Sequence, residues 1–321
     1  MNRRSLTLLG AALALAPLLG QAQSFPEKPI TFVVPFAAGT ATDQIARALG
    51  NVITAETKQA VVIDNRAGAS GFIASQFVAK APADGYTVLI TTNTTHAANE
   101  HLFKKLPYDP VKDFAPLAGL GKGGQIMVVN PASNVKSVAD FIALAKKEPG
   151  KLSFGSGSSS SRMAGELLQQ MADIKLLHVP YKSNTLAVTD LLGGQIDMMI
   201  TDTATGLPQV KGGKLRALGM SSASRSPLAP DVPTIAEAGV KGYEMGYWFA
   251  AYAPAKTPPA VVKRLNELLV KAAKSDSAKT AFYVPSGTEV FTTSPDELAK
   301  FQAGESQKWG RIVKAAGIEA E

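Results

Sequence analysis

The sequence predicts an α/β fold, and three observations lead to this prediction. Apolar runs of strand length alternate with amphipathic segments of helical periodicity along most of the chain. Stretches rich in glycine or serine fall between a run of the first kind and a segment of the second. No internal repeat of roughly 20–50 residues is visible, which excludes a solenoid. We therefore expect mixed, mainly parallel sheets with helices between their strands.

The first strand and helix set the pattern for the rest. Residues 31–36 form an apolar run typical of a buried strand, and apolar residues then recur at helical spacing at Ile45, Leu49, Val52 and Ile53. Further runs predict strands at 61–63, 86–91, 126–129, 152–155, 177–181, 195–201 and 215–220. Helices are predicted around residues 166–171 and 185–192, and after Ser137, which forms a capping box with Asp140.

Two interruptions of this alternation divide the chain. Prolines and charges break it at residues 106–110 and again around 239–246, and we expect the chain to cross between two lobes there. Beyond the second break, residues 247–253 predict a strand, Pro258-Pro259 opens a helix, and Ser294 caps a long last helix. We expect the chain to consist of a leader segment, residues 1–22, a first lobe formed by residues 23–125 and 247–321, and a second lobe formed by residues 126–246. Two such lobes leave a cleft at the carboxyl ends of the strands, where α/β folds place ligands.

The amino-acid composition excludes several classes of function. The 321 residues suffice for about two domains, and 45% apolar with 18% charged residues indicates a globular protein. The formal net charge is +7, but the basic residues are scattered, so we expect no nucleic-acid partner. Without cysteine there are no disulfides, thiolate nucleophiles or Cys-ligated metals, and no two of the three histidines are spaced for an HExxH site. We therefore expect no metal site.

The first residues predict export. Arg3 and Arg4 precede a short apolar run, and small residues then stand at positions suited to signal-peptidase cleavage near residue 22. The apolar run is too short to span a membrane comfortably. We expect a cleavable signal peptide and a soluble exported protein that begins near Gln23, with twin-arginine export as an alternative to the general secretory route.

The loop after the first strand is a candidate anion site. Small residues let the backbone approach a ligand, and the N–H groups that begin a helix can bind a carboxylate or phosphate. The alternative is a tight turn in which Thr42 or Asp43 only caps the helix. The loop lacks the lysine of a nucleotide-binding P-loop. Its candidate ligand-binding residues are Phe36, Ala38, Gly39, Thr40, Thr42 and Asp43.

A serine-rich loop at residues 155–162 is the second candidate. Ser158 and Ser159 offer hydroxyls and amides, and Arg162 adds a fork that can bind an anion from the other lobe. A flexible linker is the alternative. No GxSxG elbow is present and nothing in the sequence places a histidine beside these serines, so we do not expect an enzyme.

Other strand ends contribute further candidates. The polar loop after residues 86–91 offers Thr92, Asn93 and Thr95, while Asp202 ends another strand and Trp248 either walls the cleft or fills a core. We expect Asp43 and Asp202 to hold loop amides, or to meet an ammonium group, rather than to touch a carboxylate. The glycine-rich turn at residues 65–71 is interpreted as a structural turn in which Arg66 is tied to a carboxylate or to carbonyls.

At these loops the sequence resembles a known family. The motifs resemble the periplasmic substrate-binding proteins of tripartite tricarboxylate transporters, the Bug family, and they run in order from about residue 25 to the end: KPITFVVPFAAGTATDQIAR, DNRAGASGFIA, APADGYTVLI, LPYDPVKDFAPL, HVPYKS, TDLLGGQIDMMI, GKLRALG and PDVPTIAEAG. The resemblance implies a two-lobed periplasmic binding protein fold of type II that closes over a small carboxylate. It further implies delivery to membrane permease subunits, no cofactor, and a carboxylate held by backbone amides of the first loop.

The sequence departs from the family pattern near the expected cleft. Gly39-Thr40 replaces a Gly-Gly, Asp64 stands for a glutamate, Ser183 replaces a glycine, and Arg162 stands where a histidine is common. These departures bear on which ligand is bound more than on the fold.

The expected function is therefore that of an extracytoplasmic solute-binding protein. It would act as a monomer that captures a monocarboxylate, dicarboxylate, amino acid or aromatic acid for uptake by the transporter. Two alternatives stay open: a sensory protein that presents its ligand to a membrane kinase, and an α/β hydrolase that uses the serine loop.

Overall fold

The computed structural model describes residues 25–315 and 317–320. The predicted signal peptide, residues 1–22, lies outside the described residues. Within them, no helix is both long enough and apolar enough to cross a membrane.

The first α/β unit forms where the sequence predicts it. Strand β1 (Ile30–Val34) is buried and leads into helix α1 (Ala41–Thr57), whose first turn is capped by the Thr40 hydroxyl. Lys58, in the left-handed region at φ 61°, ends the helix. Strands β2 (Val61–Asn65) and β3 (Thr87–Thr92) pair with β1 in parallel, one on each side.

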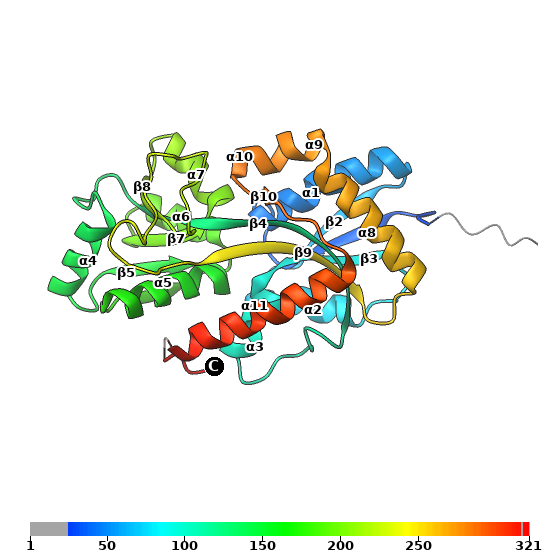
Figure 1. The fold of residues 1–321 in the computed structure, drawn as a ribbon, viewed down its shortest axis with the longest axis horizontal. Coiled ribbons are helices and arrows are strands. Elements are labelled where there is room, and N and C mark those ends of the chain that lie inside the picture. The colour runs from blue at the N-terminus through cyan, green and yellow to red at the C-terminus, as the bar shows by residue number, and fades with distance from the viewer. Residues whose placement is uncertain (1–24, 316, 321) are drawn as a thin grey trace, which may run out of the picture.

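One long strand belongs to both sheets. Strand β4 (Phe114–Val129) pairs antiparallel with β9 (Gly246–Pro254) as far as Gly124, and from Gln125 it pairs antiparallel with β7 (Met198–Asp202). Figure 1 shows β4 and β9 side by side across the middle of the molecule. The sequence predicts only residues 126–129 of this strand, because glycines and a proline interrupt the apolar pattern before them.

The second sheet lies beyond Gln125. Its strand β5 (Ser153–Ser156) pairs in parallel with β6 (Leu177–Pro180) and β7, and β8 (Arg216–Met220) pairs antiparallel with β4. The helices of this lobe are α4 (Val138–Lys147), α5 (Ser159–Ala172), α6 (Asn184–Leu192) and α7 (Thr203–Lys211). The described strands thus run β2-β1-β3-β9-β4-β7-β5-β6, with parallel pairs inside the α/β units and antiparallel pairs at β4 and β9.

The first predicted crossover is wrong. Tyr108, within residues 106–110, is buried and donates to the carbonyl of Thr95 at 2.8 Å, so this segment packs against the first lobe. The chain passes between the sheets inside β4 instead, between Gly124 and Gln125. The second predicted crossover, residues 239–246, leads directly into β9.

The remaining elements cover the first lobe. On the N-terminal side these are η1 (Ala69–Gly71), α2 (Phe72–Ala79), η2 (Thr94–Ala98) and α3 (Asn99–Leu102). After β9 follow α8 (Pro259–Lys274), α9 (Asp276–Ala278), η3 (Lys279–Tyr283), α10 (Val284–Ser286), β10 (Glu289–Val290) and α11 (Pro295–Ala315). The predicted caps form: Ser137 Oγ accepts the Asp140 amide at 3.0 Å, and Ser294 exchanges hydrogen bonds with Glu297.

The hydrophobic core follows both faces of the sheets. One cluster packs the first sheet against α1 and α8, and another packs the second sheet against α6 and α7. A third cluster continues through both lobes, from Leu89 past Met127 to Phe154. The result is a two-lobed α/β fold whose lobes are joined by continuous strands.

Candidate functional site

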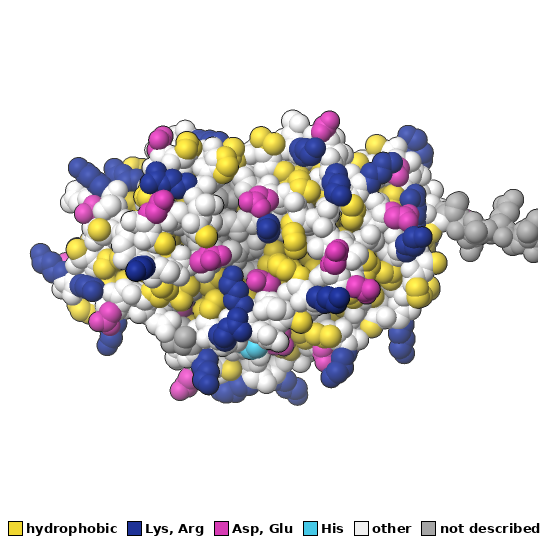
Figure 2. Space-filling view, viewed as in Figure 1, with side chains coloured by type: hydrophobic (Ala, Val, Ile, Leu, Met, Phe, Trp, Pro, Cys, Tyr) yellow, Lys and Arg dark blue, Asp and Glu magenta, His cyan; other side chains and the backbone are white. Residues whose placement is uncertain are grey.

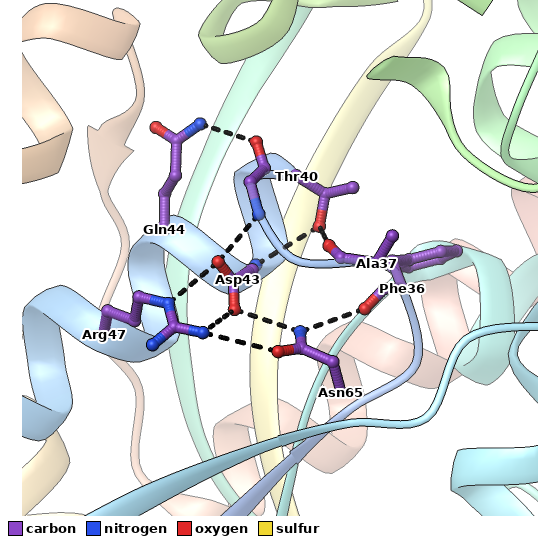
Figure 3. A network of polar contacts seen from close by, with 8 residues as sticks. Phe36, Ala37, Thr40, Asp43, Gln44, Arg47 and Asn65 are labelled. Carbon is purple, nitrogen blue, oxygen red and sulfur yellow. Dashed lines mark hydrogen bonds and ion pairs between the residues drawn. The ribbon is translucent and has the colours of Figure 1, made fainter. Parts of the chain in front are cut away.

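The loop between β1 and α1 is held by its own side chains. Asp43 Oδ2 accepts the Gly39 amide and Arg47 Nε, both at 2.9 Å, and its Oδ1 accepts Asn65 Nδ2 at 3.0 Å. The Thr40 hydroxyl donates to the Ala37 carbonyl at 2.8 Å. Figure 3 shows Asp43 at the centre of this network. These bonds tie the loop to α1 and to β2.

The charge of Asp43 is stabilised by these partners. Burial by itself would raise the pKa of this carboxyl, but the hydrogen bonds from Arg47, Gly39 and Asn65 outweigh burial and hold the pKa below its usual value. The prediction that Asp43 holds a loop amide is confirmed by the bond from Gly39.

Gly39 does not have the predicted position. Its amide is taken by Asp43, and both Ala38 and Gly39 are exposed and line neither of the cavities described below. A Cβ on Gly39 would meet no protein atom within 4 Å, and the backbone φ of +82° favours glycine at this position. The amides that remain open are those of Ala41 and Thr42, which have no acceptor among the described residues.

Four helix N-termini converge on a small cavity of about 40 Å³, which we call the inner cavity. They are those of α1, α5, α6 and α7, three of which are capped from the cavity wall by Thr40, Ser158 and Asp202. Each end carries unpaired amides and the positive end of a helix dipole. The inner cavity is lined by Phe36, Thr40, Ala41, Thr42, Thr92, Gly157, Ser158, Ser160, Asn184, Asp202, Tyr247 and Phe249.

Asn184 ties three of these helices together. Its amide oxygen accepts the Gly157 amide at 2.9 Å, and its amide nitrogen donates to Asp202 Oδ2 at 3.0 Å. Asp202 Oδ1 in turn accepts the amide of Thr205 at 2.8 Å and its hydroxyl at 2.7 Å. The carboxylate of Asp202 is thus hydrogen-bonded to its own helix and to Asn184.

The close approach of Gly157 depends on its missing side chain. A Cβ there would lie 1.8 Å from the backbone carbon of Ser183, well inside contact distance. The loop before α5 therefore packs directly on the loop before α6, and both reach the inner cavity.

A second cavity of about 430 Å³, the outer cavity, adjoins the first. The two share Phe36, Gly157 and Ser158. The outer cavity lies between the turns around η1 and α3 of the first lobe and the loops before α5 and α6 of the second lobe. Its lining residues are Pro35, Phe36, Gly68, Ser70, Gly71, Leu102, Phe103, Ser156, Gly157, Ser158, Ser159, Arg162, His178, Pro180, Tyr181 and Lys182.

A histidine does lie beside a serine of the serine-rich loop. Ser156 Oγ and His178 Nε2 are 2.7 Å apart on neighbouring strands β5 and β6, and both line the outer cavity. The expectation that no histidine meets these serines is therefore wrong, because the parallel pairing brings together residues 22 positions apart. His96, by contrast, is fully buried and stacked on Tyr252, and burial lowers its pKa to about 3.

Besides Ala38, Gly39 and Asp43, three more predicted site residues line neither cavity. Trp248 packs on Phe301 and donates to Glu305, on the opposite side of β9 from the cleft. Successive side chains of a strand point to opposite faces, so Tyr247 lines the inner cavity and Trp248 cannot. The other two, Asn93 and Thr95, are buried beneath the surface of the cleft and line neither cavity.

Each of these two side chains has an internal hydrogen-bond partner, although Asn93 Oδ1 has none among the described residues. Asn93 Nδ2 donates to the Gly246 carbonyl at 3.3 Å, and the Thr95 hydroxyl lies 2.8 Å from His96 Nδ1. Arg66, as predicted, is tied to a carboxylate, that of Asp64 at 2.7 Å.

The other predicted residues come together at the cleft. The inner cavity is lined by Phe36, Thr40, Thr42, Thr92, Ser158 and Asp202, and the outer cavity by Ser159 and Arg162. Arg162 Nε lies 3.8 Å from Glu166 Oε1.

Three residues that line the cavities were not predicted from the sequence: Asn184, Tyr247 and His178. Asn184 could have been predicted, because it lies between the predicted strand 177–181 and the predicted helix 185–192. In the part of the chain that the structure describes, no group of three acidic, histidine or cysteine side chains could hold a metal ion.

Comparison with known proteins gives a consistent result. A family described as "Tripartite tricarboxylate transporter family receptor" matches residues 45–318. Protein BugT of Bordetella pertussis is 34% identical over 321 residues, covering 98% of each chain. Among solved structures, R. palustris Rpa4515 with adipate is 35% identical with a TM-score of 0.89, covering 92% of this chain and all of that one. MatC from Rhodopseudomonas palustris with bound malate is 30% identical with a TM-score of 0.85, covering 90% and 100%.

Proposed function

The chain belongs to the tripartite tricarboxylate transporter receptor family, and from this premise we propose that it captures a small carboxylate in the periplasm for uptake by membrane permease subunits. The observation that carries the proposal is the meeting of four helix N-termini at the inner cavity. Neutral hydroxyls and amides with open helix ends suit a carboxylate, which needs hydrogen-bond donors and a positive field. Binding of adipate and malate by two structural relatives supports the same class of ligand.

The first carboxylate would bind to backbone donors. We assign to it the amides of Ala41 and Thr42, the hydroxyls of Thr40 and Thr42, and the serine end of α5 at Ser158 and Ser160. Thr92 and Phe36 complete the wall of this site. Because the helices and the Asp43 network are already in place, little ordering would be needed on binding.

Closure of two lobes would select the ligand. We divide the chain into residues 23–125 with 247–321 and residues 126–246, since β4 changes its pairing from β9 to β7 at Gln125. A ligand that touches both lobes binds the closed form more tightly and shifts the population towards it. No reaction is needed for this role, and a signal peptide over residues 1–22 would place the protein in the periplasm.

A thermal-shift and calorimetry screen over carboxylates tests the proposal. A ligand bound only by the folded protein adds about 2.7 kcal/mol of stability at a concentration of 100 Kd. We expect stabilisation by at least one carboxylate and none by the matching amide or methyl ester. Stabilisation by the neutral compounds alone would contradict the proposal.

A hydrolase is the second candidate, and one observation favours it. The pair of Ser156 Oγ and His178 Nε2 at 2.7 Å has the spacing of a nucleophile and its base. Ser156 is buried, however, and the wall around it is that of the ligand cleft. Under the binding proposal, the protein and its Ser156→Ala variant release p-nitrophenol from an acyl ester at the same background rate. Turnover that disappears in Ser156→Ala would make the hydrolase the better account.

A further inference from the structure

We propose that Tyr247 is a positioning residue that couples ligand binding in the inner cavity to the closure of the two lobes. One part of its side chain lines that cavity, and its hydroxyl contacts both lobes. The inference rests on the proposed function, because it takes the inner cavity as the ligand site and closure as the response. It adds a residue through which the ligand would act on the strands that join the lobes.

The Tyr247 hydroxyl bridges the two lobes. It lies 2.9 Å from Thr203 Oγ1, on the first residue of α7 in the second lobe, and 2.9 Å from Thr288 Oγ1 in the first lobe. All three side chains are buried. Ser286 Oγ donates to Thr288 Oγ1 at 2.8 Å, which extends the row of hydroxyls into α10. The bond to Thr203 therefore crosses between the lobes, and the bond to Thr288 does not.

Both bonds can form at the same time. Burial raises the pKa of the Tyr247 hydroxyl, which therefore keeps its proton at neutral pH. A protonated phenol has one hydrogen to donate and an oxygen that accepts, so it donates to one threonine and accepts from the other. The two bonds together fix the position of the phenol end of the side chain.

Strand β4 leaves room for this side chain at the junction of the lobes. Gly123 of β4 is the register partner of Tyr247 on β9, and a Cβ on Gly123 would lie 2.6 Å from the Tyr247 hydroxyl oxygen. The ring thus lies against the backbone of Gly123, next to the point between Gly124 and Gln125 where β4 passes from one sheet to the other. The hydroxyl contacts are made on the strands about which the lobes would move.

The ring of Tyr247 belongs to the wall of the proposed ligand site. It lines the inner cavity beside Phe249, with 5.2 Å between the ring centroids. A ligand held at α1 and packed on this ring would keep the hydroxyl where it bonds to Thr203. The effect is reciprocal, because two events that favour each other must do so equally in both directions. Loss of the bond to Thr203 should therefore weaken the ligand.

The test removes single hydroxyls and measures affinity by calorimetry with adipate and malate, the compounds bound by two structural relatives. Tyr247→Phe keeps the ring, and Thr203→Val keeps the branched shape of the threonine. Each should weaken binding about three- to tenfold, the effect of one hydrogen bond. Because Tyr247→Phe already removes the bond to Thr203, the double variant should bind as Tyr247→Phe alone does.

Tyr283→Phe is the matched control. Tyr283 is also buried and lines neither the inner nor the outer cavity, and its hydroxyl donates to the Leu120 carbonyl at 2.7 Å within the first lobe. Its loss should lower the unfolding temperature and leave the affinity for both probes unchanged. If Tyr247 had a structural role alone, Tyr247→Phe would behave in the same way.

Label distances report closure itself. The chain has no cysteine, so spin labels can be placed at Lys104→Cys in the first lobe and Lys175→Cys in the second, two exposed positions outside both cavities. Charges of both signs are interspersed on the face seen in Figure 2, so we expect the loss of two lysines to leave the attraction of an anion largely unchanged. At saturating ligand the otherwise unaltered protein should show the shorter distance, and Tyr247→Phe should keep a fraction at the distance of the unliganded protein.

The outcomes separate this inference from the proposed function. Unchanged affinity in Tyr247→Phe or in Thr203→Val, for a probe that binds the unaltered protein, would overturn the inference and leave the proposed function standing. If neither probe nor any other carboxylate of the screen binds the unaltered protein, both fail together.

Discussion

The Ser159 hydroxyl donates to Asn99 Oδ1 at 2.9 Å, and this bond joins α5 of the second lobe to α3 of the first across the cleft. Both side chains are buried. Asn99 is itself held by the Ser70 carbonyl, to which its amide donates at 2.9 Å. Under the proposed closure of the lobes, this bond would stabilise the form that a ligand selects.

The first prediction concerns this contact. Ser159→Ala should weaken ligand binding by about 0.5–1.5 kcal/mol, the value of one hydrogen bond, mainly through faster dissociation. Stopped-flow kinetics with calorimetry measures both quantities. Thr189→Ala is the matched control, because it deletes an exposed hydroxyl that bonds only within α6. A Ser159→Ala protein with unchanged affinity would show that the bond contributes nothing to closure.

The second prediction isolates a backbone donor. Ala41→Pro removes the N–H at the first position of α1, where proline is tolerated, and Thr40 at φ −71° and ψ 161° already has the conformation that precedes proline. We expect a loss of binding of about tenfold or more with little change in unfolding temperature. Ala41→Gly keeps the N–H and should bind within a few-fold of the unaltered protein. Full affinity in Ala41→Pro would move the first carboxylate away from α1.

The third prediction follows from the pKa of Asp43. Because the folded protein lowers this pKa, the resulting stabilisation is complete above the usual value of 3.8 and is lost as the pH falls through the lower value of the folded state. Asp43→Asn should therefore be less stable by about 1–3 kcal/mol at neutral pH and lose less on acidification. Urea unfolding at pH 7 and in strong acid checks this. Parallel curves for the two proteins at all pH values would contradict it.

A fourth prediction uses two glycines in different surroundings. Gly157→Ala would force a Cβ against the backbone of Ser183, so we expect a loss of about 1–3 kcal/mol of stability and impaired ligand binding. Gly304→Ala lies on α11 with no atom within 4 Å of the new Cβ, and should stabilise the helix by about 0.5–1 kcal/mol. Chemical denaturation of both variants tests the contrast, which reversed signs would refute.

Local structure could be predicted from the sequence because its causes are local. The caps at Ser137 and Ser294 depend on residues three positions away, and both form as predicted. The role of Asp43 in holding a loop amide has the same origin, a carboxylate four residues after Gly39. Alternating apolar and amphipathic segments indicated the α/β class because their periods reflect which face of each element is buried.

The site itself was decided by tertiary structure. Strand pairing set His178 beside Ser156 and joined Asn184 to both Gly157 and Asp202, contacts that no local spacing encodes. Tyr247 and Trp248 are neighbours on β9 and therefore point to opposite faces of the sheet, so Tyr247 lines the cleft and Trp248 packs away from it. The sequence thus determined which segments become strands and capped helices. The convergence of four helix ends on one cavity depended on pairings between distant strands, because their geometry is set only when the sheets assemble.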